Sequence, residues 1–126
     1  MLIAPLFGTA LLVAVSAEPL NNAGDPAHLT LQAKMEATNP LVRSATECIV
    51  RAVAADPRYG SKQAALGDLI VASMTACVTP VRAMIDGYDR YYGDGTGEAF
   101  FMGPYLDLLP KAVVEEIEKK ATQETK

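Results

Sequence analysis

A single pair of cysteines, Cys48 and Cys77, limits how the rest of this 126-residue chain can be arranged. A disulfide between them would close a loop of about 30 residues and stabilise a small domain by roughly 3 to 4 kcal/mol. Neither has a second cysteine or a histidine close behind it, which excludes a thioredoxin-like dithiol and a c-type haem attachment. We predict one intrachain disulfide; two buried thiols or an intermolecular link are the alternatives.

The N-terminal segment bears on whether such a disulfide can persist. Residues 2–15 are uncharged and almost wholly apolar, and Val15-Ser16-Ala17 is a small-residue pattern that signal peptidases accept. The run is shorter than the roughly 20 residues that cross a bilayer as a helix, which favours a removed signal peptide over residues 1–17. Leaders usually open with Lys or Arg and this one does not, so a retained anchor or a buried first helix is the alternative. We expect a periplasmic or secreted protein, because disulfides persist in oxidising compartments.

Helical periodicity dominates the rest of the chain. Apolar residues recur three and four positions apart between breaks at proline and glycine, without convincing strand alternation. The expected fold is all-α, a small bundle of four to five helices pinned by one disulfide, with a Gly- and aromatic-rich loop before the last helix. We expect residues 18–24 to be a flexible lead-in, residues 25–121 a single helical domain and residues 122–126 a frayed tail.

Prolines mark the expected helix boundaries in the first half of the domain. Asp25-Pro26 predicts a short helix to about Thr38, and Asn39-Pro40 predicts the start of a second helix that ends at Asp56-Pro57. After a turn over residues 56–60, we expect a helix that Thr79-Pro80 breaks or kinks.

The disulfide places a geometric condition on the helix that carries Cys77. In a hairpin turning at residues 57–60, Cys48 lies about nine residues before the turn and Cys77 about seventeen after it, a mismatch of roughly 12 Å at the rise of a helix. A disulfide needs Cα atoms within about 7 Å. The two helices could cross, or the helix that carries Cys77 could begin several residues after the turn. We predict a late start near Gly67, because glycine is a weak helix former.

The C-terminal part begins with a Gly-Asp-Gly-Thr-Gly run over residues 93–97, which we expect to be a loop. Pro110 is expected to open the last helix. Its predicted inward residues share helical spacing and are Val113, Val114, Ile117 and Ala121.

Arg82, Asp86 and Arg90 stand four residues apart and therefore line one helix face as plus, minus, plus. Such a row is commonly a solvated set of ion pairs that contributes a few tenths of a kcal/mol per pair. The functional alternative is a recognition stripe for a charged partner.

Four carboxylates gather around the glycine run. Hard oxygen ligands on flexible backbone are what calcium requires, but the spacing fits no EF-hand, so these residues are weak metal candidates: Asp86, Asp89, Asp94 and Glu98. The loop is acidic and follows no strand, which argues against a phosphate site. His28 is the only imidazole, and the sequence does not supply the other members of a catalytic triad or a metal cluster. We expect no cofactor.

Six of the eight phenylalanine and tyrosine residues fall within residues 88–105. They are Tyr88, Tyr91, Tyr92, Phe100, Phe101 and Tyr105. One interpretation is a small internal cluster that seals a loop against the helices. The other is an exposed contact surface, since tyrosine is enriched at protein interfaces.

The net charge of −4 leaves no basic footprint for nucleic acid. Our leading expectation is an exported, non-enzymatic helical protein that binds another macromolecule, most simply a protein, through the segment 88–105. A ligand or calcium carrier, or an enzyme using the carboxylates near the glycine run, is a second hypothesis. A third is an envelope assembly subunit held in the membrane by an uncleaved leader. The oligomeric state does not follow from the sequence.

Overall fold

The computed structural model describes residues 28–61 and 63–124. Within them there is no strand, and the all-α prediction is confirmed. The elements are α2 (Leu31–Ala55), α3 (Leu66–Ser73), α4 (Val78–Tyr92), α5 (Thr96–Phe100), a π-helical turn η2 (Phe101–Tyr105) and α6 (Leu106–Glu124). The predicted signal peptide (1–17), the lead-in (18–24) and the helix start at Asp25-Pro26 lie outside the described residues, as do residues 125 and 126 of the predicted tail.

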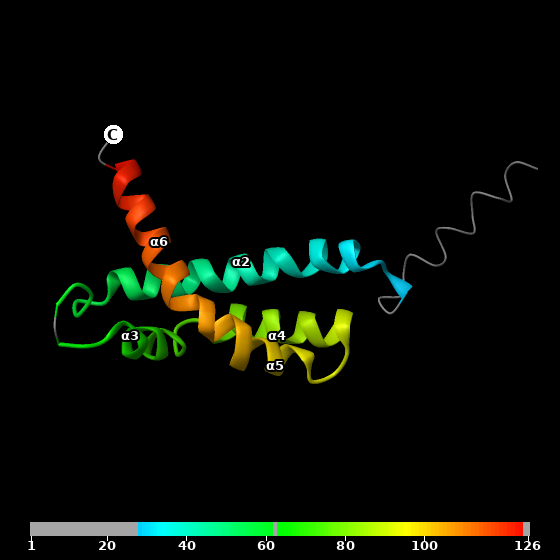
Figure 1. The fold of residues 1–126 in the computed structure, drawn as a ribbon. Coiled ribbons are helices and arrows are strands. Elements are labelled where there is room, and N and C mark those ends of the chain that lie inside the picture. The colour runs from blue at the N-terminus through cyan, green and yellow to red at the C-terminus, as the bar shows by residue number, and fades with distance from the viewer. Residues whose placement is uncertain (1–27, 62, 125–126) are drawn as a thin grey trace, which may run out of the picture.

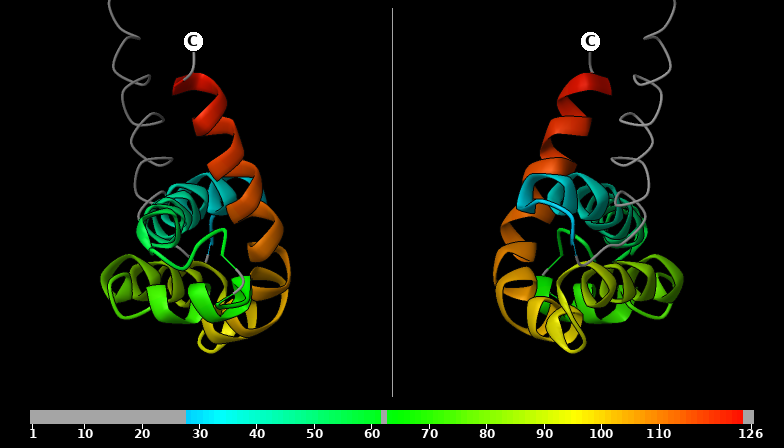
Figure 2. Two further views of the ribbon diagram at one scale, coloured as in Figure 1. Left: turned by 90° about the vertical axis from the view of Figure 1, so that its left-hand side faces the viewer. Right: turned by 90° about the vertical axis from the view of Figure 1, so that its right-hand side faces the viewer.

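Helices α2 and α4 run antiparallel side by side, and α6 crosses α2 and projects beyond it (Figures 1 and 2). Buried side chains from α2, α3, α4 and α6 pack together to form the hydrophobic core. This core consists of Ala45, Ile49, Val50 and Val53 of α2, Leu69 and Ile70 of α3, Cys77 before α4, Val81 and Met84 of α4, Tyr105 of η2, and Leu109 and Val113 of α6.

Cys48 and Cys77 form the predicted disulfide, with their Cα atoms 5.9 Å apart. It joins the C-terminal half of α2 to the residue that precedes α4. The late start is also confirmed, because α3 begins at Leu66. The expected continuation to Thr79 is wrong: α3 ends at Ser73, and residues 74–77 form turns. Pro80 lies in the first turn of α4, where a missing N–H leaves no helical hydrogen bond unmade.

The predicted break at Asn39-Pro40 is wrong, because α2 passes through Pro40 without interruption. It begins at Leu31, after Thr30 accepts a capping hydrogen bond from the Ala33 amide at 3.1 Å. A proline inside a helix costs about 3 kcal/mol. Packing outweighs that cost: α2 lies against α4 on both sides of the proline, and Pro40 itself faces solvent.

The C-terminal part of the chain also contains more helix than predicted. The loop is limited to residues 93–95, because α5 begins at Thr96. Pro110 lies inside α6, which begins at Leu106 rather than at the proline. Val113 is buried and Ile117 packs on the core, whereas Ala121 lines an open groove with Val50 and Ala54 of α2 and is exposed. Ala121 therefore faces α2 as predicted but is not part of the buried core.

Candidate functional site

The Asp89 side chain holds together the loop that connects α4 and α5. Its Oδ1 atom accepts hydrogen bonds from the amides of Gly95 and Gly97 at 3.1 and 2.8 Å. The Thr96 hydroxyl lies 2.9 Å from the Tyr88 carbonyl oxygen, within reach to donate to it. Gly95 has a φ of 90°, a conformation that glycine adopts without strain. The arrangement makes Asp89 a clamp that holds the glycine loop and directs α5 back along α4.

The structure does not bring the four candidate carboxylates together as ligands. Asp89 is engaged by the loop amides, whereas Asp86, Asp94 and Glu98 are exposed side chains. Among the described residues, no group of three or more His, Cys, Asp or Glu side chains could hold a metal ion. His28 is exposed and precedes α2.

The aromatic segment forms a row of rings. Tyr88 stacks on Phe100 with centroids 4.2 Å apart, and Phe100 continues to Tyr105 at 5.6 Å. Tyr105 is only 6% exposed, and its hydroxyl lies 2.8 Å from that of Thr46 on α2. These rings therefore connect α4, α5 and η2 to α2, and Tyr105 belongs to the core rather than to the surface. Tyr88, Tyr91, Tyr92, Phe100 and Phe101 are half-buried.

The burial of Tyr105 predicts sensitivity to alkali. Burial raises the pKa of Tyr105 above its ordinary value of 10.0, and the hydrogen bond with Thr46 opposes this only in part. The folded protein then keeps a proton that the unfolded chain releases, so stability falls as pH rises through about 10 toward the folded pKa. We expect Tyr105→Phe to lose about 1 kcal/mol at neutral pH, with its hydrogen bond, but to lose less stability than the wild type in alkali. Urea unfolding over this pH range measures both effects, and parallel pH profiles would contradict the prediction.

The charged stripe lies exposed along α4, and none of its three residues makes an ion pair with another residue that the structure describes. Between described residues, the one ion pair within 4.0 Å is Arg58 with Asp56, in the turn after α2. That contact holds the pKa of Asp56 below its ordinary value, chiefly through the side-chain hydrogen bond from Arg58. Arg82 and Asp86, although one turn apart, do not pair with each other.

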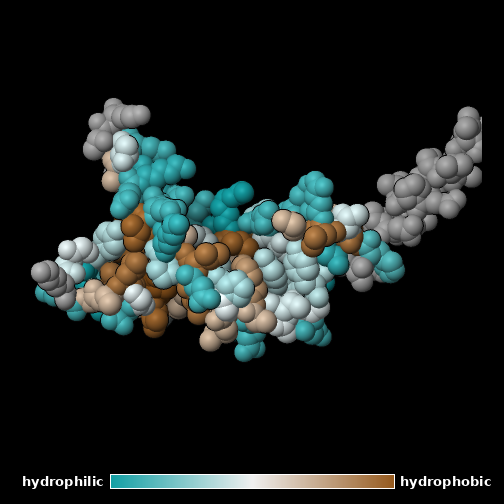
Figure 3. Space-filling view, in the orientation of Figure 1, coloured by the Kyte–Doolittle hydropathy of each residue, from teal (hydrophilic) through white to brown (hydrophobic). Residues whose placement is uncertain are grey.

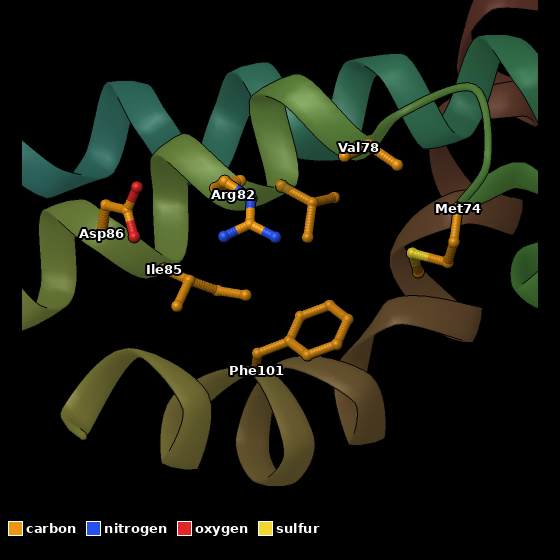
Figure 4. Close-up of a pocket in the computed structure, with 7 residues that line it drawn as sticks. Met74, Val78, Arg82, Ile85, Asp86 and Phe101 are labelled. Atoms are coloured by element: carbon orange, nitrogen blue, oxygen red, sulfur yellow. The ribbon is translucent and has the colours of Figure 1, made fainter.

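Arg82 and Asp86 instead border an apolar groove between α4 and η2 (Figure 4). The groove has a volume of about 240 Å³. Its other walls are Met74, Val78, Val81, Ile85 and Phe101. The guanidinium of Arg82 points toward Phe101 across this groove (Figure 4). Val78 is 53% exposed, so apolar surface remains open to solvent here.

A second groove follows the other side of α4, between α4 and α2, with a volume of about 340 Å³. It is lined by Ala37, Leu41, Ala83, Asp86, Gly87, Arg90 and Tyr91. The guanidinium of Arg90 lies 5.9 Å from the centre of the Tyr91 ring, within cation–π range. We define the α4 face as the exposed ridge of Arg82, Asp86 and Arg90 together with these two grooves.

The sequence-predicted features thus divide between two places. Tyr88, Phe100 and Tyr105 form internal packing, whereas Tyr91 and Phe101 meet the charged stripe on the α4 face. Val78 and Met74 were not predicted as site residues. Because α3 was expected to continue to Thr79, the sequence offered no sign that the chain turns there and leaves Val78 exposed.

Another apolar surface lies where α6 leaves the bundle. Figure 3 shows apolar side chains over the part of α6 nearest the bundle, whereas hydrophilic ones cover its C-terminal end. Leu108 is 67% exposed beside a groove of about 220 Å³ that no charged residue lines. The groove itself is therefore uncharged, unlike the two grooves that border the charged stripe on α4.

The described residues include no single helix that is long and apolar enough to cross a membrane. Only α3 and α4 taken together meet that requirement, and they are bent by 85°. The chain matches no protein-family model, no curated protein and no solved structure.

Proposed function

We propose that this chain is an exported, non-enzymatic protein that binds another protein through the α4 face. The disulfide is compatible with an oxidising extracellular compartment. The leader-like character of residues 1–17 supports export to such a compartment.

One observation carries the proposal: the charged stripe of α4 and the aromatic segment meet on one surface. Arg82 and Asp86 of the charged stripe line the same groove as Phe101 of the aromatic segment. Arg90 and Tyr91 lie in the adjacent groove, and Asp86 borders both. Tyrosine and arginine are enriched among the residues that contribute most to protein–protein affinity.

The chemistry of the α4 face suits a protein partner. An apolar side chain inserted between Val78 and Phe101 would remove exposed apolar surface from water, at about 25 cal/mol per Å². The unpaired charges along the ridge would orient the partner and accelerate encounter, while contributing less to affinity. The result is an apolar contact area bordered by charge, as in many protein interfaces.

The test is affinity capture from the native envelope with the disulfide-bonded protein as bait. We expect Arg82→Glu and Phe101→Ala each to reduce the captured partner at least tenfold, about 1.4 kcal/mol. Arg43→Glu is a matched control, because Arg43 is an exposed arginine on α2, outside the α4 face. The intact mass of bait recovered from the envelope should correspond to a chain that begins at Glu18.

Thermal unfolding establishes that each variant remains folded before capture is compared. Equal capture by Arg82→Glu and Arg43→Glu would show that the α4 face is not the binding surface. Bait that retains Met1 would contradict removal of the leader.

A further inference from the structure

We propose that the partner of the α4 face is a second copy of this chain, with the two α4 helices antiparallel across a two-fold axis. In this arrangement, Arg82 of each copy pairs with Asp86 of the other. The inference rests on the proposed function, because it identifies the partner of the same surface.

The structure has two exposed stripes with the same charge pattern, one on α2 and one on α4, and they differ in the charges that surround them. Arg43, Glu47 and Arg51 on α2 repeat the plus, minus, plus order of Arg82, Asp86 and Arg90 on α4, at the same spacing. The chain itself supplies opposite charges to Arg43 and Glu47 of the α2 stripe. Glu116 and Lys119 of α6 line the same cleft, of about 540 Å³, as Arg43 and Glu47.

The α4 stripe receives no such charges. Both grooves that flank it are lined only by uncharged residues apart from the stripe itself. Between residues that the structure describes, neither stripe makes an ion pair within 4.0 Å, but only the α2 stripe shares a cleft with opposite charges from another helix. The complementary charges for Arg82 and Asp86 must therefore come from outside this copy or from solvent.

The stripe is complementary to itself about a two-fold axis. In a symmetric dimer, if residue i contacts residue j, then j contacts i. Arg82 and Asp86 are separated by about 6 Å along the helix axis, the rise of four residues. A two-fold axis midway between them sets each arginine opposite an aspartate in antiparallel helices. Two favourable pairs form, without any like-charge contact between these residues.

The same register also covers apolar surface. It sets Val78, which is 53% exposed, opposite Arg90 of the second copy, whose aliphatic stem can pack on it. Ala83, an exposed small residue, lies next to the axis and permits close approach of the two helices. The alternative register, which pairs Asp86 with Arg90, leaves Val78 beyond the paired residues. We therefore favour the Arg82–Asp86 register.

Apolar burial supplies most of the affinity in this dimer, and the charges set the register. Exposed ion pairs contribute about 0 to 1 kcal/mol each. A charge reversal has a larger effect than removal of a pair, because symmetry converts one substitution into two like-charge contacts. An exchange of both charges restores both attractive pairs.

The experiment is analytical ultracentrifugation of the purified, disulfide-bonded protein over a wide concentration range. We expect a monomer–dimer equilibrium that Arg82→Asp and Asp86→Arg each weaken at least tenfold, about 1.4 kcal/mol. The double variant R82D/D86R should bind within about threefold of the wild type, which corresponds to less than 1 kcal/mol. Arg43→Asp, the same reversal on the α2 stripe, should leave the equilibrium unchanged.

Three results would overturn the inference: a monomer at every concentration, a dimer insensitive to Arg82→Asp, or a double variant as weak as the single variants. A monomer whose capture of a different protein still depends on Arg82 would refute the second copy and leave the proposed function standing. If neither self-association nor capture depends on Arg82, both proposals fail. The substituted side chains are exposed, and circular dichroism with thiol titration confirms that each variant is folded and oxidised.

Discussion

Replacement of Gly97 by alanine is expected to lower the free energy of unfolding by about 3 kcal/mol. An added Cβ would overlap the backbone carbonyl of Ile85, lying 2.7 Å from its carbon atom. Backbone cannot move aside as a side-chain end can, so α5 would have to shift away from α4. The shift would strain the hydrogen bond from the Gly97 amide to Asp89 and the stack of Phe100 on Tyr88. Urea unfolding monitored by circular dichroism measures the loss.

Two other glycines serve as controls for the Gly97 substitution. Gly67 lies exposed in α3 with open space around its Cα, so Gly67→Ala is expected to stabilise the protein by about 0.5 to 1 kcal/mol. At Gly87 the added Cβ meets only the end of the Leu41 side chain, which can rotate. The change in the free energy of unfolding for Gly87→Ala should lie between the changes for Gly67→Ala and Gly97→Ala. A Gly97 variant as stable as the wild type would mean that α4 and α5 do not approach this closely.

Loss of the disulfide should be the other large effect. We expect the double substitution of Cys48 and Cys77 by alanine to reduce stability by roughly 3 to 4 kcal/mol. The bridge spans a sequence separation of 29 residues, and this loop is free to expand in the unfolded chain once the bridge is lost. For a domain of this size, the melting temperature should fall on the order of 20 °C. Calorimetry in the presence and absence of reductant measures the change.

The alanine variant also provides the control for the reductant. Because it has no disulfide, its melting temperature should not respond to reductant, whereas that of the wild type should fall to a similar value. If oxidised and reduced wild-type protein melt at the same temperature, the bridge does not stabilise the fold.

Local patterns were sufficient to predict the helical class and the disulfide. Helical spacing of apolar residues is a property of short windows, and it correctly marked Val113 as a core position and Ile117 as a residue that packs on the core. A helix start near Gly67 was predicted from the reach of the bridge, although that argument placed Cys77 on the same helix, whereas Cys77 follows the turns after α3. Both arguments need only the sequence and the dimensions of a helix.

The candidate site was predictable only in its parts. The charged spacing of Arg82 and Asp86 and the aromatic density after residue 88 are visible in the sequence. Their meeting at one groove depends on the loop that Asp89 clamps, because this loop turns α5 back along α4 and places Phe101 opposite Arg82. Which rings become core and which reach the surface depends on the same turn.

The residues by themselves determined that the chain is helical, that its two cysteines pair, and that charge recurs along one face of α4. Only the tertiary structure decided that α2 continues through Pro40, that Pro104 lies in a π-helical turn, and that Tyr105 is buried. The helical repeat and the Cα–Cα distance of a disulfide have fixed dimensions, so both can be applied directly to the spacing of residues in the sequence. Whether a helix continues through a proline, or a tyrosine becomes buried, depends instead on a difference of a few kcal/mol. That difference lies between local conformational preference and packing against residues distant in sequence.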